Sequence, residues 1–100
     1  MNRYWYFYFE GVFEDSSRRE GLYSSAMLSS ADEKSAQREL KKNLSEEGIR
    51  LVDVEESFEF KISEVDPNNK DNIEWLSMYE EAERTGGCIY TPWHVFPLEK

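Results

Sequence analysis

The sequence is poor in cysteine, histidine, proline and long apolar runs, and each shortage narrows the class of protein. A single cysteine, Cys88, excludes an internal disulfide, which fits a reducing compartment. One cysteine and one histidine are too few for a structural zinc site, which takes about four such ligands. The amino terminus lacks the basic region, apolar run and cleavage site of a signal peptide, and no apolar run approaches the roughly 20 residues that span a bilayer. We therefore expect a cytoplasmic protein.

Basic residues are also scarce. The chain has 12 Lys and Arg residues against 21 Asp and Glu residues, a net charge of −9. The imbalance is concentrated in residues 45–83, where thirteen acids face Arg50, Lys61 and Lys70, a local balance of 3 − 13 = −10. Because contact with phosphates needs Lys and Arg arrayed on a face, this charge disfavours nucleic acid and anionic membranes as direct partners.

Aromatic residues are abundant, and they are concentrated at the start of the chain. Six follow one another from Tyr4 to Phe9. Neighbouring side chains of a strand point to opposite faces, so this segment has two apolar faces and belongs in the middle of a sheet that is covered on both sides. With 39% apolar residues in 100, the chain has enough core material for one domain, residues 1–100, without metal or disulfide.

The next elements are marked by turns and periodicity. A polar stretch, residues 14–21, predicts a hairpin loop, and residues 22–30 predict a second strand with Leu22, Ser24, Ala26 and Leu28 on one side. The segment from Ser30 to Glu33 has the form of a capping box. A helix follows, with Ala36, Leu40 and Leu44 at intervals of four and Gly48 as its terminator.

From Ile49 onward, apolar residues recur at every second position, as in a β-strand. One parity is apolar and predicts the buried face: Val52, Val54, Phe58, Phe60 and Ile62. The other carries Asp53, Glu55, Glu59 and Lys61. Glu56 breaks the pattern, so Glu55-Glu56-Ser57 predicts either a bulge in one strand, which we favour, or a turn between two.

The last third of the chain predicts a loop, a helix and a final strand. Residues 66–72 have the composition of a loop, and a helix with an apolar face runs from Ile73 to Gly86-Gly87. Residues 88–91 resume extended structure before Pro92 and Pro97 limit the last strand. The predicted fold is α+β: an antiparallel sheet of about four or five strands with two helices, in the order β-β-α-β(β)-α-β. We expect both helices largely on one face, although the two-faced first strand allows one on each side.

Catalytic residues are hard to assemble from this sequence. Cys88 and His94 could generate a thiolate nucleophile, but the Thr91-Pro92-Trp93 interruption leaves their geometry undefined. Adjacent carboxylates such as Glu55 and Glu56 diverge on a strand or a helix, so they do not converge on one point. We therefore predict no catalytic site, no metal site and no cofactor.

The remaining feature is an acidic surface. In one interpretation it is a solvated face that serves only to promote solubility. Its functional interpretation is a docking face for a basic protein, because opposed potentials accelerate encounter and reject wrong partners. An exposed tryptophan, Trp75 or Trp93, would serve as an anchor. The predicted partner-binding residues are Asp53, Glu55, Glu56, Glu59, Glu64, Asp66, Asp71, Glu74 and Trp75.

Four segments carry a resemblance to a known class of proteins: Trp5-Tyr6, Phe9-Glu10, the Ser30 to Ala36 helix opening, and the acidic strand from Val52 to Val65. In these the chain resembles the immunity proteins of bacterial toxin systems, particularly those of contact-dependent growth inhibition. The resemblance implies a protein that binds one cognate toxin domain tightly, often a nuclease, and blocks its active site or substrate surface. We expect the chain itself to be a monomer or a weak homodimer. Two alternatives stay open: a small enzyme that uses a carboxylate or Cys88 with His94, and an accessory protein that self-associates through an edge strand.

Overall fold

The computed structural model describes residues 3–15 and 17–98. Along the chain the elements are β1 (Arg3–Phe13), β2 (Glu20–Ser30), α1 (Glu33–Glu46), β3 (Ile49–Phe60), the 3-10 turns η1 (Ile62–Glu64) and η2 (Lys70–Asn72), α2 (Ile73–Thr85), β4 (Ile89–Tyr90) and β5 (His94–Pro97). The predicted α+β fold is confirmed, and its order of elements matches except that two short strands, β4 and β5, stand in place of the single final strand. Of the predicted hairpin loop, Ser16 lies outside the described residues.

The five strands form one antiparallel sheet in the order β3-β1-β2, with β4 and β5 both paired to the outer side of β2. β1 is the central strand, as the aromatic run predicts, and Phe7 and Phe9 are fully buried in it. β3 forms one edge of the sheet, and no described strand pairs with its outer side.

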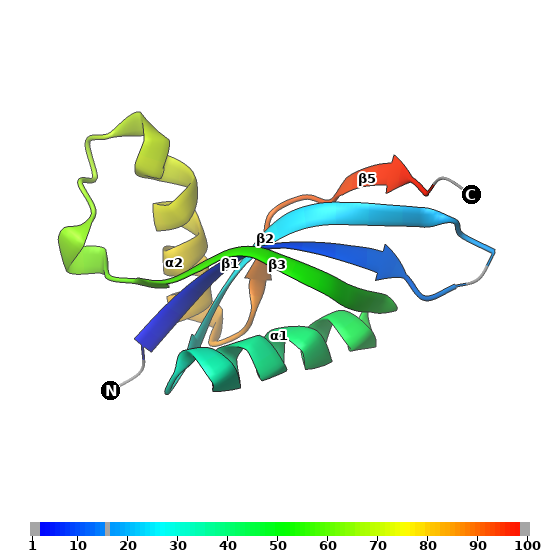
Figure 1. Ribbon diagram of the computed structural model, residues 1–100. Coiled ribbons are helices and arrows are strands. Elements are labelled where there is room, and N and C mark those ends of the chain that lie inside the picture. The colour runs from blue at the N-terminus through cyan, green and yellow to red at the C-terminus, as the bar shows by residue number, and fades with distance from the viewer. Residues whose placement is uncertain (1–2, 16, 99–100) are drawn as a thin grey trace.

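One face of the sheet is covered by α1. The odd positions of β1, such as Phe7, and the even positions of β2, such as Leu22, point to this face and pack against Ala36, Leu40 and Leu44 of the helix. The spacing of four along α1 therefore places its apolar stripe on the sheet, as the sequence predicts. Figure 1 shows α1 beneath the strands.

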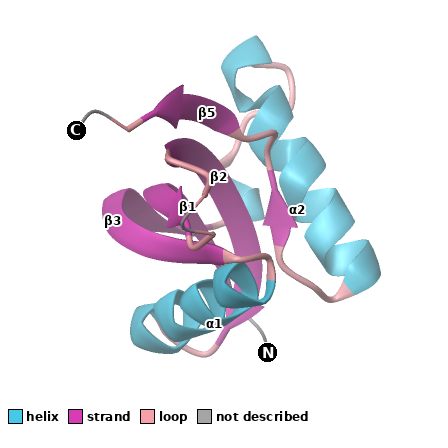
Figure 2. Cartoon of the chain, turned by 90° about the vertical axis from the view of Figure 1, so that its right-hand side faces the viewer, coloured by secondary structure: helices cyan, strands magenta, loops and turns pink. Residues whose placement is uncertain are grey.

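The opposite face is covered in part by α2. Met78 and Ala82 of this helix pack with Tyr6, Met27 and Phe60 from three neighbouring strands. The expectation that both helices lie largely on one face is wrong, because the alternating aromatic residues of β1 expose an apolar surface on each side and each needs its own cover. Figure 2 shows the helices apart from each other, with α1 below the strands and α2 beside them.

β3 contains two bulges, and at each one the alternation of its side chains between the two faces of the sheet is shifted. At the first bulge, Asp53 pairs with Glu10 and Leu51 with Gly11, so Val52 has no partner on β1. At the second, Glu56 pairs with Tyr8 and Val54 with Phe9, so Glu55 has no partner on β1. The second bulge is the one that Glu55-Glu56-Ser57 predicts. The prediction that the apolar residues at alternate positions of this strand all share one buried face is wrong, because each extra residue shifts the alternation by one position.

The residues that the sequence predicts on one buried face therefore lie in different environments. Val54 faces α1, whereas Phe58 and Phe60 face α2. Val52 is exposed, and Ile62 is exposed in η1 beyond the end of the strand. In their place Ile49 and Leu51 complete the core against α1.

Both helices end as predicted, but α1 begins differently. Its N-cap is Asp32, whose carboxylate accepts a hydrogen bond of 2.8 Å from the backbone N–H of Ser35. The predicted Ser30 cap is wrong because β2 continues to Ser30 in its pairing with Arg3. Gly48 and Gly86 follow the helices with positive φ angles, 76° and 73°, which glycine adopts without a Cβ penalty.

Candidate functional site

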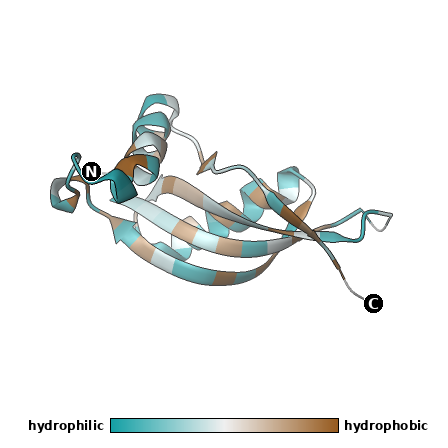
Figure 3. Cartoon of the chain, turned by 90° about the horizontal axis from the view of Figure 1, so that it is seen from above, coloured by the Kyte–Doolittle hydropathy of each residue, from teal (hydrophilic) through white to brown (hydrophobic). Residues whose placement is uncertain are grey.

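An open area remains on the face of the sheet that α2 covers in part. α2 packs over the end of this face that contains Tyr4, Tyr6 and Met27, and no described helix packs over the other end. Figure 3, seen from above, shows the strands in front of α1 with α2 at one end only. We call this open area the uncovered face; its side chains come from β1, β2, β3 and β5, and they are Tyr8, Glu10, Val12, Tyr23, Arg50, Asp53, Glu55, Glu56, His94 and Phe96.

A row of aromatic rings crosses the uncovered face. The Tyr8 and Tyr23 rings are nearly parallel, at 16°, with centroids 6.0 Å apart. The Phe96 ring continues the row at 5.2 Å from Tyr23. Tyr8 is 37% exposed, although it lies in the central strand of the sheet. The row is therefore an accessible aromatic surface, in contrast to the buried Phe7 and Phe9 on the other side of the same strand.

Carboxylates gather beside this row. Glu10 on β1 pairs directly with Asp53 on β3, and the second bulge turns Glu55 toward them. The Asp53 carboxyl beside Glu55, together with the charge of Glu10, raises the pKa of Glu55. The charges of Glu10 and Glu55 likewise raise the pKa of the Tyr23 hydroxyl, with Glu10 as the larger cause. Among the described residues, the ion pairs involve none of these three acids.

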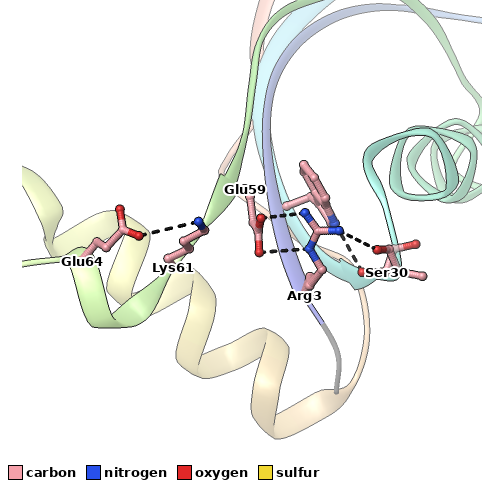
Figure 4. A network of polar contacts seen from close by, with 7 residues as sticks. Arg3, Ser30, Glu59, Lys61 and Glu64 are labelled. Carbon is pink, nitrogen blue, oxygen red and sulfur yellow. Dashed lines mark hydrogen bonds and ion pairs between the residues drawn. The ribbon is translucent and has the colours of Figure 1, made fainter.

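Glu59 belongs to the other face of β3. It is held by Arg3, whose Nη2 and Nε donate to the two carboxylate oxygens at 2.8 and 3.1 Å (Figure 4). The hydrogen bond from Arg3 lowers the pKa of Glu59. The predicted acidic strand is thus divided: Asp53, Glu55 and Glu56 lie on the uncovered face, whereas Glu59 is neutralised by an internal partner.

The predicted acids after β3 lie in the turns and in the start of α2. Glu64 is 3.7 Å from the Lys61 ammonium (Figure 4), and the Asp66 carboxylate accepts a hydrogen bond from the backbone N–H of Asn68. Asp71 lies in η2 and Glu74 in the first turn of α2. The acids from Glu64 to Glu74 therefore form a second exposed group, in other elements than the uncovered face.

Neither tryptophan is an exposed anchor. Trp75 is partly buried, with its ring 5.4 Å from Phe58 and 5.7 Å from Tyr6 between centroids. Trp93 is also partly buried and packs beside Tyr90 on the α1 side. The sequence does not predict that Tyr8, Glu10, Tyr23 and Phe96 lie together on an accessible surface. The one signal for them is Glu10, which interrupts an otherwise apolar central strand.

The structure separates the two residues of the cysteine–histidine hypothesis. Cys88 packs with the core on the α1 side, whereas His94 pairs with Tyr23, whose side chain lies on the opposite face. Burial raises the pKa of the Cys88 thiol to about 11. In residues 3–15 and 17–98, no group of three His, Cys, Asp or Glu residues is arranged to hold a metal ion.

A groove of about 570 Å³ runs between α2 and β4. Its floor is apolar, with Met78 and Ile89, and Glu74 and Glu81 line it from α2. It brings one predicted acid, Glu74, to the mouth of a concave surface, but Asp53 and Glu55 are not part of it. The groove and the uncovered face are thus separate features on the same side of the sheet.

No protein-family model, curated protein or solved structure matches this chain significantly. The helices within the described part of the chain are too short and too polar for any of them to span a bilayer.

Proposed function

We propose that this chain is an immunity protein that acts in the cytoplasm, where it binds a basic cognate toxin domain, a nuclease, and neutralises it by charge-complementary contact. The observation that carries the proposal is the uncovered face. It combines an aromatic row, in which Tyr8 is exposed and Tyr23 and Phe96 are half-buried, with carboxylates that form no ion pair among the described residues. A toxin that binds nucleic acid presents Lys and Arg, and carboxylates placed on this face would occupy the positions of phosphates.

The central strand supports the same proposal. Burying both faces of β1 would be the simplest way to use its aromatic residues, yet the even positions from Tyr8 onward are left without a helix above them. Exposed aromatic rings are favoured at protein interfaces because they bury a large area at little cost in side-chain entropy. An acidic surface kept only for solubility has no need of them.

The test is neutralisation of the polypeptide encoded by the gene immediately upstream in the source genome. We expect the two purified proteins to form a complex that suppresses nuclease activity and that associates more slowly at about 0.5 M than at about 0.05 M NaCl. The variant Asp53→Lys with Glu55→Lys should lose neutralisation. The matched control, Glu46→Lys with Glu47→Lys, makes the same change of charge at the exposed end of α1 and should retain it.

Two outcomes would contradict the proposal: no complex with that polypeptide, or a complex whose formation is independent of salt. Self-association is the alternative with an observation in its favour, because the outer edge of β3 is unpaired in the described part of the sheet. Sedimentation of the isolated chain separates the two, since a tight homodimer would point to the accessory protein.

A further inference from the structure

The uncovered face has the components of a site for one particular side chain. Its aromatic row ends at Tyr8, the ring nearest to β3, because the strand order is β3-β1-β2 with β5 beyond β2. Asp53 and Glu55 lie on β3 on that same side of the sheet. A cation placed on the free side of the aromatic row therefore lies beside these carboxylates.

Acids outnumber bases on the uncovered face: Glu10, Asp53, Glu55 and Glu56 share it with Arg50, which pairs with Val12 near the start of β3. Asp53 and Glu10 lie close enough to Glu55 that their negative charges raise its pKa. Like charges held together on a surface are relieved by a cation from outside, and the ion pairs of the described residues supply none. A second copy of this chain, with its net charge of −9, is a poor occupant.

The molecule uses the same combination twice for its own arginines. The Arg3 guanidinium lies 4.9 Å from the centroid of the Trp5 ring and is paired with Glu59 at 2.8 Å. The Arg18 guanidinium lies 3.6 Å from the Phe13 ring and is paired with Glu20 at 2.6 Å. In each case an aromatic face and a carboxylate hold one guanidinium.

We propose that the uncovered face binds an arginine side chain of the partner protein, with its guanidinium on the Tyr8 and Tyr23 rings and paired with Asp53 and Glu55. Arginine fits better than lysine, because the planar guanidinium stacks on aromatic rings and donates two parallel hydrogen bonds, whereas the ammonium is a compact, strongly hydrated charge. This inference rests on the proposed function for the identity of the partner as a basic protein.

The test uses a peptide, so it does not depend on finding the toxin. The labelled protein is titrated with a capped hexapeptide of alternating glycine and arginine, and with its lysine counterpart, while backbone amide shifts are followed by NMR. We expect the arginine peptide to shift amides around Tyr8, Tyr23 and Asp53, and to bind roughly threefold more tightly than the lysine peptide. Equal affinities, or shifts centred on α2, would overturn the inference.

Two variants locate the contact, with two matched controls. Tyr8→Leu keeps an apolar side chain in the strand but removes the ring, and Asp53→Asn with Glu55→Gln removes two charges with little change in shape; both should weaken binding of the arginine peptide severalfold. The controls make the same kinds of change elsewhere on the molecule: Tyr79→Leu, and Glu46→Gln with Glu47→Gln. They should leave binding of the arginine peptide unchanged. If the controls weaken binding equally, the attraction is diffuse and the arginine site is excluded.

The two proposals fail in different ways. Peptide binding at the uncovered face without neutralisation of any upstream product would leave the arginine site standing and overturn the immunity function. Neutralisation that survives Tyr8→Leu, with no selective binding of the arginine peptide, would leave the function standing and overturn the site.

Discussion

The Tyr6 hydroxyl lies 2.7 Å from the Ser25 Oγ across the β1–β2 pair, and both side chains are buried beneath α2. This hydrogen bond lies within a cluster formed mainly by apolar side chains. Tyr6→Phe would leave Ser25 without this partner, and Ser25→Ala would do the same to Tyr6. Each should lower the free energy of unfolding by about 1–2 kcal/mol, whereas the double variant should lose less than the sum.

A matched control for this pair is Tyr90→Phe. The Tyr90 hydroxyl is buried, and it has no hydrogen-bond partner among the described residues. Removing it should leave stability unchanged or raise it, because an unsatisfied group is removed. Urea denaturation of the four variants measures the differences. A loss in Tyr90→Phe equal to that in Tyr6→Phe would contradict the assigned partner of Tyr6.

The structure leaves no space for a side chain at Gly11 of β1. A Cβ at this position would lie 2.7 Å from Ile49 Cγ2 and 3.2 Å from the backbone oxygen of Arg50. Gly11→Ala should therefore destabilise the protein by about 1–3 kcal/mol, as expected for overpacking. Gly87→Ala is the control, since its nearest atom would be Thr85 Oγ1 at 3.7 Å. Thermal unfolding of both variants should show a loss for Gly11→Ala alone.

The cap of α1 gives the stability a dependence on pH. The hydrogen bond from the Ser35 backbone N–H holds the pKa of Asp32 below its usual range. The unfolded chain therefore binds more protons near this pKa, so the stabilisation is present at neutral pH and is lost as pH falls through the folded-state pKa. Asp32→Asn keeps a capping oxygen but does not titrate.

The measurement is urea denaturation between about pH 6 and pH 3. Wild type should lose more stability across this interval than Asp32→Asn, since Asp15 and Glu59, whose pKa values are also lowered, contribute equally to both proteins. Ser30→Ala, at the position where the sequence predicts a cap, should match wild type at every pH. Identical pH profiles for wild type and Asp32→Asn would contradict the role of Asp32.

Cys88 should be unreactive in the folded protein. With its pKa raised to about 11 by burial, the thiol forms roughly 100-fold less thiolate at pH 8 than an exposed cysteine does. Iodoacetamide should modify it slowly in buffer and rapidly in guanidinium chloride. Fast modification of the folded chain would restore the hypothesis of a cysteine nucleophile, which the separation of Cys88 from His94 does not support.

The sequence predicts the elements of this fold better than their relative placement. Strand β1 and helix α1 are recoverable because six adjacent aromatic residues and a spacing of four are local signals. The bulge at Val52 leaves no such signal, since a valine fits either parity. The side of the sheet that each helix covers depends on contacts between distant segments, such as Tyr6 with Met78, which periodicity does not contain.

The candidate site shows the same limit. Asp53 and Glu55 are predictable from the charge imbalance, but their neighbour Tyr8 comes from a strand that the sequence predicts to be covered on both faces, and nothing in the sequence brings Tyr23 beside it. Glu59 is an acid at an odd position of the same strand, like Asp53 and Glu55, yet Arg3 neutralises it from 56 positions away in the chain. Charge counts along a sequence do not reveal such pairs.

The unpaired edge of β3 has a consequence for solution behaviour. A long free edge is a template on which copies of a chain add strand to strand into ribbons. Here Asp53, Glu55 and Glu56 lie along that edge, and the two bulges bend it, so copies repel one another at neutral pH. Acid removes the charge but leaves the hydrogen-bonding groups exposed. The carboxylates that we assign to partner recognition thus also act as gatekeepers against fibrillar assembly.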